Sequence, residues 1–407
     1  MLDNPDPDPD SEAELAFLVA LRRHLHRIPE LRFQEFKTAE YLKSVVDPLA
    51  DDVIDGVGGT GVFAILEGSS PGLKVLLRAD MDAYPVTEAS GVPYAAKCEG
   101  VAHACGHDVH MAVVVGVLQR LAKDRPATGT VHVLFQPAEE IPFGQESGAR
   151  AVLDSGVLHS DYDAVLGLHC WPHLDAGFIG IDRSIAMAAK DSFKIEVIGA
   201  GAHAAIPSSG RDSVLAISEL VVSLHALLAR RRDPHEMVAF NVGTIAGGAS
   251  QSLVPPSASV TGTLRTLDEV VRARLKETVE QVCRGFEMQH DVTINLTWAD
   301  EMPALMNAVR LVDLGLQISS KLAEVVELST PPMTADDFAL LAALWPGLYV
   351  KLGIRQPGVT ASPSLHSPMF TVAEECLLTG VNTLEWLTRQ VLRRGSKEEQ
   401  RNASEPS

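Results

Sequence analysis

One short segment of the chain is unusually dense in residue types that bind metals. Residues 102–110, AHACGHDVH, hold three histidines, a cysteine and an aspartate in nine positions. Thiolate and imidazole are the ligands that zinc and neighbouring transition metals prefer. The simpler alternative is that Asp108 only caps the apolar helix that follows. The two interpretations are compatible, because a helix N-terminus is a rigid place from which to hold ligands.

Carboxylates follow two apolar runs that are typical of buried strands. Asp80 and Asp82 end the run LKVLLRADMDA and, being two residues apart, project to the same side. Glu139 and Glu140 follow TVHVLFQP, and adjacent carboxylates repel each other unless a cation or a proton intervenes. A metal-bound glutamate beside a general base explains the second pair. Solvated loop acids explain both pairs as well.

A single histidine, His169, lies near the end of a further apolar run, AVLGLHCWP. Taken alone, such a residue is more often a core or edge histidine than a ligand. Its position favours the second role, because the carboxyl ends of parallel strands meet at one edge of an α/β sheet. Four successive strand ends thus bring Asp, Cys and His, Glu, and His to one edge, which predicts a metal site there.

The elements that must position these residues alternate between apolar runs and helical stretches up to about residue 187. This alternation predicts an α/β sheet with helices on both faces. The order then changes to βαββαβ, typical of a ferredoxin-like α+β module, and the buried α/β character returns near residue 300. We therefore expect two domains and two solvated tails, with these boundaries: tail 1–14, catalytic domain 15–187 and 299–395, inserted domain 188–298, and tail 396–407. A capping box from Ser11 to Glu14 is expected to begin the first helix.

Composition excludes several classes of function. The 407 residues carry a formal charge of −19, which disfavours binding to nucleic acid or to an anionic membrane. Five scattered cysteines argue against a disulfide framework. We find neither a signal peptide nor a run of about 18 apolar residues, so we expect a cytoplasmic protein.

Eight motifs occur in order across residues 15–395: RADMDA, HACGHD, QPAEE, GLHCWP, GAGAHAAIP, GTLRT, MTADDF and LHSPMF. Together they resemble the metal-dependent amidohydrolases that include hippurate hydrolases, N-acyl-amino-acid aminoacylases and auxin-conjugate hydrolases. The resemblance implies a zinc-peptidase-like α/β catalytic domain with an inserted lid and dimerisation domain. It also implies two divalent metal ions per subunit, which could be Zn, Mn, Co or Ni.

The same resemblance assigns roles to individual residues. It implies five metal ligands, the first of them a thiolate that bridges both ions: Cys105, His107, Glu140, His169 and His366. Glu139 matches the general base, and Asp82 matches an acid that supports the site from behind a ligand. Asp80 stands where distant relatives have a metal-binding histidine, so its role is left open.

Residues in the inserted domain are implied to contact the substrate. His203 matches a histidine that polarises the scissile carbonyl, often from the partner subunit, although it could also be a polar loop residue. Arg265 could pair with a substrate carboxylate or serve the inserted sheet structurally. Three features depart from the family pattern: Ser252 replaces an asparagine, Asp336 replaces a glutamate, and residues 141–150 form an insertion beside the site.

The function that the resemblance implies is hydrolysis of the amide bond of N-acyl amino acids, hippurate-like or related small conjugates. A water activated by the two metal ions would attack the carbonyl, with Glu139 as the general base. A dipeptidase or carboxypeptidase on the same site is an alternative, and a catalytically silent metal-binding dimer is a further one. The expected partners are a small-molecule substrate and a second copy of the chain, joined through the inserted domain.

Overall fold

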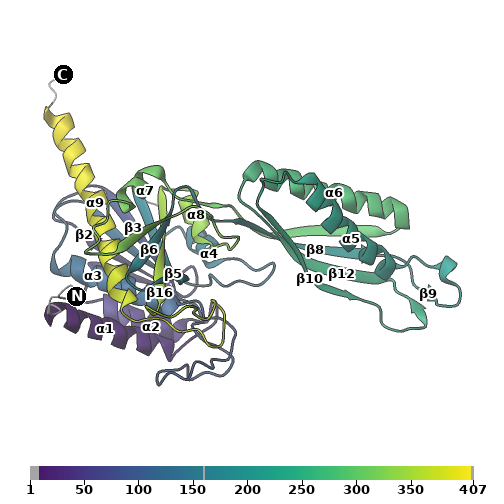
Figure 1. Cartoon of the computed structure of the whole chain (residues 1–407), viewed down its shortest axis with the longest axis horizontal. Coiled ribbons are helices and arrows are strands. Elements are labelled where there is room, and N and C mark those ends of the chain that lie inside the picture. The colour runs from purple at the N-terminus through teal and green to yellow at the C-terminus, as the bar shows by residue number, and fades with distance from the viewer. Residues whose placement is uncertain (1–8, 159–160, 405–407) are drawn as a thin grey trace.

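An eight-stranded mixed sheet forms the larger part of the molecule in the computed structural model, which describes residues 9–158 and 161–404 (Figure 1). Its strands, in spatial order, are β1 (Asp52–Val57), β2 (Gly61–Glu67), β4 (Thr130–Gln136), β3 (Lys74–Asp80), β5 (Ala164–Asp175), β16 (Gly347–Arg355), β6 (Phe178–Asp182) and β15 (Glu324–Leu328). The central pairs β4–β3, β3–β5 and β5–β16 are parallel. The prediction of a mixed α/β fold is thereby confirmed.

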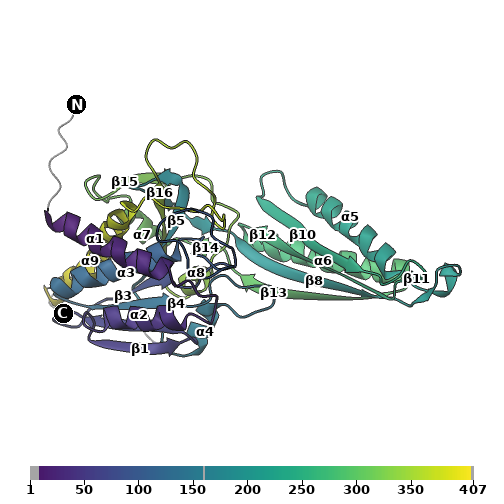
Figure 2. The same cartoon turned by 90° about the horizontal axis from the view of Figure 1, so that it is seen from below.

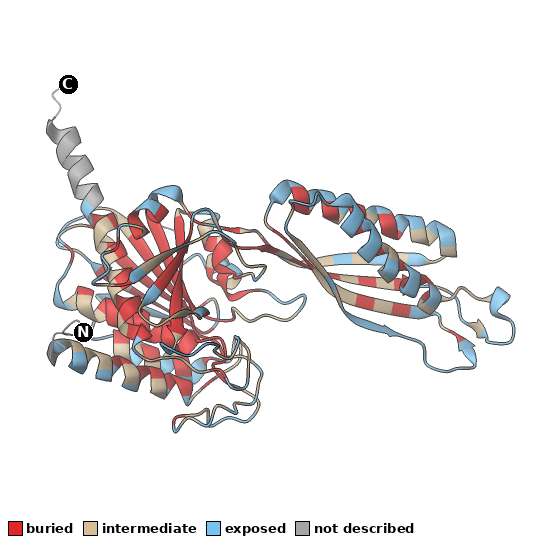
Figure 3. Cartoon of the chain, in the orientation of Figure 1, coloured by how far each residue is buried: buried red, intermediate tan, exposed pale blue. Residues whose placement is uncertain are grey.

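Helices cover both faces of this sheet, and the core lies beneath them (Figure 3). One face is covered by α1 (Pro9–His26), α2 (Phe36–Val46), α3 (His107–Lys123), α7 (Val309–Gly315) and α9 (Cys376–Ser404). The other face is covered by α4 (Gly148–Asp154) and α8 (Phe338–Ala342). The side chains of β3 point alternately to the two faces. Val75 and Leu77 pack in the core beneath the first group of helices, and Leu76 packs in the core beneath α4 and α8.

A separate four-stranded antiparallel sheet projects beside the large sheet (Figures 1 and 2). Its spatial order is β10 (Val238–Gly247), β12 (Ser257–Thr266), β8 (Ala189–Ile198) and β13 (Thr293–Met302), and α5 (Ser213–Arg231) and α6 (Glu269–His290) cover one of its faces. We call residues 189–302 the four-stranded module. The element order within it is βαββαβ, apart from the short elements β9 (Ala202–His203), η1 (Pro207–Ser209) and β11 (Leu253–Val254). The strands β7 (Ile185–Met187) and β14 (Leu305–Met306) pair where the chain enters and leaves it.

Helix α5 is the one helix in the described part of the chain that is long and apolar enough to cross a membrane, by length and composition alone. No continuous run of about 18 apolar residues is present in the sequence, because polar residues such as Glu219 and His225 interrupt α5. In the structure Ala216, Leu220, Leu224 and Leu228 recur at helical spacing and are buried in the core of the module. The apolar character of α5 therefore has a packing role on this sheet.

Both predicted tails are shorter than expected. Helix α1 begins at Pro9 instead of at a Ser11 capping box, because Asp10 and Glu12 in its first turn favour the positive end of the helix dipole. Glu14 instead accepts hydrogen bonds from Arg120 on α3, at 2.6 Å to both Nε and Nη2. Helix α9 continues to Ser404. Residues 396–404 include good helix formers such as lysine, glutamate and arginine, and none of them is proline. Residues 1–8 and 405–407 lie outside the described residues.

Candidate metal centre

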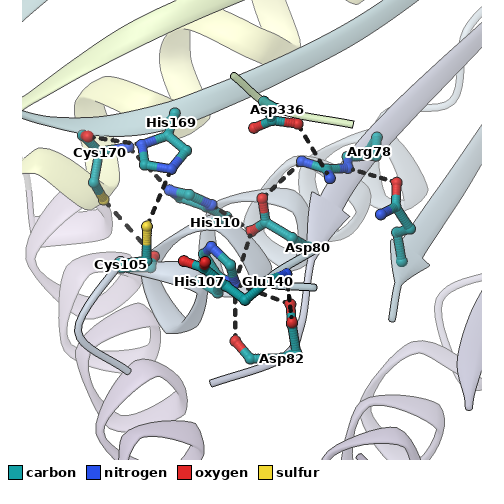
Figure 4. Close-up of polar contacts among 12 residues, drawn as sticks. Arg78, Asp80, Asp82, Cys105, His107, His110, Glu140, His169, Cys170 and Asp336 are labelled. Carbon is teal, nitrogen blue, oxygen red and sulfur yellow. Dashed lines mark hydrogen bonds and ion pairs between the residues drawn. The ribbon is translucent and has the colours of Figure 1, made fainter. Parts of the chain in front are cut away.

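The cluster of potential ligands lies at the carboxyl edge of the parallel strands β4, β3 and β5 (Figure 4). Asp80 ends β3, Glu139 follows β4, and His169 lies on β5 beside them. His107 is the first residue of α3, so the helix start faces the same edge. The order and parallel direction of the strands thus bring together residues that are far apart in the sequence, such as Asp80 and His169, which are 89 positions apart.

Two buried imidazoles are oriented by backbone carbonyls. His107 Nδ1 donates to the carbonyl oxygen of Asp82 at 2.8 Å, and His169 Nδ1 donates to that of Cys170 at 2.8 Å. These hydrogen bonds fix the tautomer of the neutral imidazole, in which Nδ1 carries the proton and Nε2 carries a free lone pair. His107 Nε2 is buried without a hydrogen-bond partner among the described residues, and His169 Nε2 lies 3.4 Å from Cys105 Sγ. An orphaned buried imidazole nitrogen of this kind fits a metal ion.

The thiol of Cys105 belongs to two overlapping groups of donors. One group is Cys105, His107 and His169, and the other is Cys105, Glu140 and His366, each with its donor atoms within 4.8 Å of one another. His366 Nε2 and Glu140 Oε1 are 2.6 Å apart. Burial, and then the carboxylates of Glu140 and Glu139, raise the pKa of the Cys105 thiol well above its ordinary value. A thiolate here therefore requires positive charge beside it, and the donor set fits two divalent ions.

Glu139 lies on the wall of a cavity of about 170 Å³ that also contains Cys105, His169 and His366. Burial, and then the neighbouring Asp336 and Glu140, raise the pKa of its carboxyl well above the ordinary value. A group held near a reacting centre with a raised pKa is suited to accept a proton. Glu140 lines the same cavity, so four of the five predicted ligands share it with the predicted base.

A buried carboxyl that the sequence analysis missed supports the turn that carries Glu139. Glu35 Oε1 accepts a hydrogen bond from the Ala138 backbone N–H at 2.9 Å, and its Oε2 accepts one from the Thr60 hydroxyl at 2.5 Å. Ala138 has a φ of +50°, a conformation that costs free energy in a residue other than glycine. Nothing in the local pattern ELRFQEF distinguishes Glu35 from its solvated neighbours.

The two aspartates after β3 have different partners. Asp82 Oδ2 accepts from the Glu140 backbone N–H at 2.9 Å, and its Oδ1 lies 3.3 Å from His107 Nδ1. Asp80 Oδ1 pairs with His110 Nδ1 at 2.5 Å, while the other nitrogen of His110 accepts from the Cys170 backbone N–H at 2.9 Å. Asp80 therefore orients His110, and both nitrogens of His110 are already engaged.

A second buried acidic pair backs the cavity. Asp336 lines the cavity and accepts hydrogen bonds from the Phe338 backbone N–H at 2.8 Å and from the Tyr349 hydroxyl. Asp337 accepts from Arg78 at 2.7 Å and from Gln136. The guanidinium of Arg78 thus offsets part of the negative charge that these acids bring to the site.

Asp108 does not cap α3, contrary to the simpler alternative for this segment. The N-cap position is occupied by Gly106 at φ +89°, where an added Cβ would lie 2.6 Å from Cys170 Sγ. Asp108 is fully buried inside the first turn and accepts from Arg22 Nε at 2.6 Å and His26 Nδ1 at 2.8 Å. Its role is to join α1 to α3.

The predicted substrate-contacting residues are divided between two places. Arg265 lines the cavity, and its Nη1 donates to the Met333 carbonyl at 2.9 Å. Burial lowers the pKa of its guanidinium. His203 and Ser252 are exposed beside the β9–β11 pair, which Figure 1 places at the end of the module farthest from the large sheet. Within one chain the structure does not bring these two residues to the cavity.

The insertion at residues 141–150 divides into a loop and the start of α4, whose first turn is capped by Ser147. The loop reaches the four-stranded module, because the Gly144 backbone N–H donates to Asp300 Oδ1 at 3.2 Å. Ile141 lines the cavity itself. The insertion is therefore part of the cavity wall.

Comparisons with known proteins agree with this geometry. The chain matches the family described as peptidase family M20/M25/M40 over residues 76–390. It is 35% identical over 363 residues to an N-acetyl-L-cysteine deacetylase of Bacillus subtilis, which covers 89% of this chain and 85% of that protein. Thermostable carboxypeptidase 2 of Saccharolobus solfataricus is 32% identical, with 89% and 92% covered. The crystal structure of a dinuclear metal-binding peptidase of the M20 family from Bacillus subtilis has a TM-score of 0.80 at 29% identity, with 94% and 99% covered.

Proposed function

The chain belongs to peptidase family M20/M25/M40 and is a metal-dependent hydrolase that acts on amides, and we propose that its substrates are N-acyl amino acids or related small conjugates. The observation that carries the proposal is that Glu139 shares one cavity with Cys105 and His169. Glu139 also belongs with His107, whose Nε2 is orphaned, and Glu140 to a group of donor atoms within 4.8 Å of one another. The relative named as a deacetylase of N-acetyl-L-cysteine supports an acyl group on the nitrogen of an amino acid.

The proposed ligands of the two ions are the residues that share the thiol of Cys105: His107, Glu140, His169 and His366, with Cys105 itself common to both groups. When bound, the two cations supply Lewis acidity that polarises the amide carbonyl and lowers the pKa of water. The Asp82 carboxylate accepts from the Glu140 backbone N–H, and the Asp82 backbone carbonyl accepts from the His107 ring, so Asp82 orients two of these ligands.

Glu139 is the proposed general base. Its carboxylate takes a proton from the water that attacks the amide carbon, and the proton is then delivered to the leaving nitrogen as the C–N bond breaks. The products are a carboxylic acid and a free amino acid. The turn at Ala138, held by Glu35, sets the position of Glu139 relative to the ligands.

The test is a panel of N-acyl amino acids assayed on protein loaded separately with Zn, Mn, Co or Ni. We expect amide hydrolysis with at least one metal, and a loss of at least about 100-fold in kcat for Glu139→Gln with nearly unchanged metal content. Full activity of Glu139→Gln would refute the assigned base. No turnover by the folded, metal-loaded wild type on any substrate would refute the proposed substrate class.

A carboxypeptidase or dipeptidase on the same site is the second candidate, because one relative is named as a carboxypeptidase. Both reactions release an amino acid by breaking an amide bond, so the site residues do not separate them. Peptides with a free amino terminus, added to the same panel, distinguish the two activities by their relative kcat/KM.

A homodimer is the third part of the proposal. His203 is exposed far from the cavity of its own chain, and the module presents β10 as a sheet edge and Leu215, Val222 and Leu227 on the outer face of α5. Edges and apolar faces of this kind favour association. We infer that His203 of the partner subunit completes the site.

We also propose that the enzyme is cytoplasmic. Its five cysteines are all free in the structure, which supports a reducing compartment.

A further inference from the structure

Two cationic side chains lie on the part of the cavity wall that the four-stranded module supplies. Lys190 on β8 and Arg265 on β12 both line the cavity that contains Cys105 and Glu139. They are direct partners in the antiparallel register of the two strands. Directly opposed residues lie on one face with their Cβ atoms about 5 Å apart, and like charges in such a pair are destabilising. A pair of this kind is stabilised when an anion occupies the space before it.

Arg265 has no carboxylate partner among the described residues, and Lys190 has only one long ion pair, with Asp300. Arg265 donates to the neutral carbonyl of Met333, and no carboxylate lies within ion-pair distance of it in the described part of the chain. Lys190 Nζ is 3.9 Å from Asp300 Oδ2, too far for a hydrogen bond, and its side chain is only 19% exposed. Two partly desolvated positive charges therefore face the cavity.

The two charges are held at separate points. Arg265 on β12 lies to one side of β8 and is fastened to Met333, whereas Asp300 on β13 lies to the other side and draws Lys190 toward it. Asp300 is itself fixed, because its other oxygen accepts from the Gly144 backbone N–H in the inserted loop. This separation suits two anionic groups better than one carboxylate shared by both cations.

We propose that Lys190 and Arg265 form a two-point anion subsite that selects N-acyl derivatives of acidic amino acids, with Lys190 as the residue that determines this specificity. The inference rests on the proposed function of the same cavity. Arg265 receives the α-carboxylate and Lys190 receives the side-chain carboxylate. The apolar side chains of Trp171, Met187 and Met302 line the same cavity, where they contact the carbon chain between the two carboxylates.

The test compares N-acetylglutamate with N-acetylglutamine, which differ only by a carboxylate and a carboxamide. We expect the wild type to favour N-acetylglutamate by about tenfold or more in kcat/KM, mainly through KM, because the ion pair forms in a partly dry cavity. Lys190→Met should remove this preference, because KM should rise about tenfold more for N-acetylglutamate than for N-acetylglutamine. Lys190→Arg should retain most of it.

Lys194→Met is the matched control. Lys194 lies on the same strand and the same face as Lys190, but it is 40% exposed, pairs with Glu196 at 2.7 Å and does not line the cavity. We expect this variant to keep the wild-type preference. If Lys194→Met loses the preference as fully as Lys190→Met does, the effect is one of overall charge and the subsite is wrong.

Equilibrium binding separates the subsite from the reaction. Glutarate should raise the melting temperature of the metal-loaded wild type more than butyrate does, and Lys190→Met, folded by circular dichroism, should lose the difference. If the wild type cleaves N-acetylglutamine and N-acetylglutamate with equal kcat/KM, the subsite is wrong and the proposed function stands. If it cleaves no N-acyl amino acid, the proposed function fails, and the contrast between glutarate and butyrate still decides whether the subsite exists.

Discussion

At the scale of single residues, the site depends on groups that the sequence marks and on others that it does not. Cys105, His107 and Glu139 stand in dense or adjacent patterns that predict chemistry. Glu35 has no such pattern, yet it is fully buried and holds the backbone of Ala138 at a positive φ. Burial raises the pKa of the Glu35 carboxyl to about 7, against the opposing effect of the Thr60 hydrogen bond.

This shift predicts a dependence of stability on pH that belongs to Glu35. Because the folded-state pKa lies above the ordinary value near 4.5, the stabilisation is present at low pH and is lost as the pH rises through about 7. Glu35→Gln removes the titration while keeping an amide oxygen for the Ala138 N–H. Relative to this variant, we expect the wild type to lose on the order of 2–3 kcal/mol between pH 5 and 8.5.

The measurement is urea denaturation of both proteins across that pH range at constant metal concentration. Other groups titrate in both proteins alike, so the difference between the two curves isolates Glu35. Parallel curves would show that the carboxyl titrates in the folded protein as it does in the unfolded chain.

At the scale of elements, α1, α3 and the strand ends must be fixed relative to one another before the ligands converge. Arg22 on α1 is 1% exposed and donates to the buried Asp108 on α3, one residue after His107. His26 joins the same carboxylate at 2.8 Å. The start of α3 is thus connected through charged groups to a helix 86 residues earlier in the chain.

Removal of one partner from this buried pair should be costly. Arg22→Met leaves Asp108 as a buried charge with only His26 to compensate it, and we expect a loss of about 3–5 kcal/mol in the free energy of unfolding. Arg183→Met is the control, because the Arg183–Glu327 pair is exposed, with 61% and 47% of the side chains accessible, and its loss should change stability far less than the loss of the buried pair. Equal effects in urea denaturation would mean that the buried pair contributes no more than a surface pair.

At the scale of the whole molecule, the four-stranded module supplies both a wall of the cavity and a distant exposed tip. Lys190 and Arg265 lie where the module meets the large sheet, whereas His203 lies at the opposite end. A residue cannot act at a site that its own chain holds far away. If His203 takes part in the reaction, it therefore acts in a second subunit.

Mixing two inactive variants tests this arrangement. Glu139→Gln lacks the proposed base, and His203→Ala lacks the histidine, but a heterodimer of the two contains one site with both groups if His203 acts across the interface. We expect co-expression of the two variants to restore about a quarter of wild-type activity, since about half of the dimers are mixed and each has one complete site. No recovery, or a monomer by light scattering with full activity, would refute the exchange.

The sequence by itself determined the mixed α/β class and the residue types of the site, because both depend on local patterns. Apolar runs predict buried strands, and a cysteine, histidines and paired carboxylates just beyond those runs predict a metal-binding edge. The bounds of the two tails were placed wrongly, since α1 begins at Pro9 and α9 continues to Ser404, and helix propensity and charge in the terminal turns decide such limits more finely than composition does.

Only the tertiary structure decided which residues face one another. Asp80 orients His110, Asp108 joins two helices, and Lys190 stands opposite Arg265, although nothing in the spacing along the chain distinguishes these residues from solvated ones. The physical reason is that desolvation and pairing depend on neighbours from distant segments. The free energy of a charge is set by those neighbours, and the register of the folded strands is what brings them together.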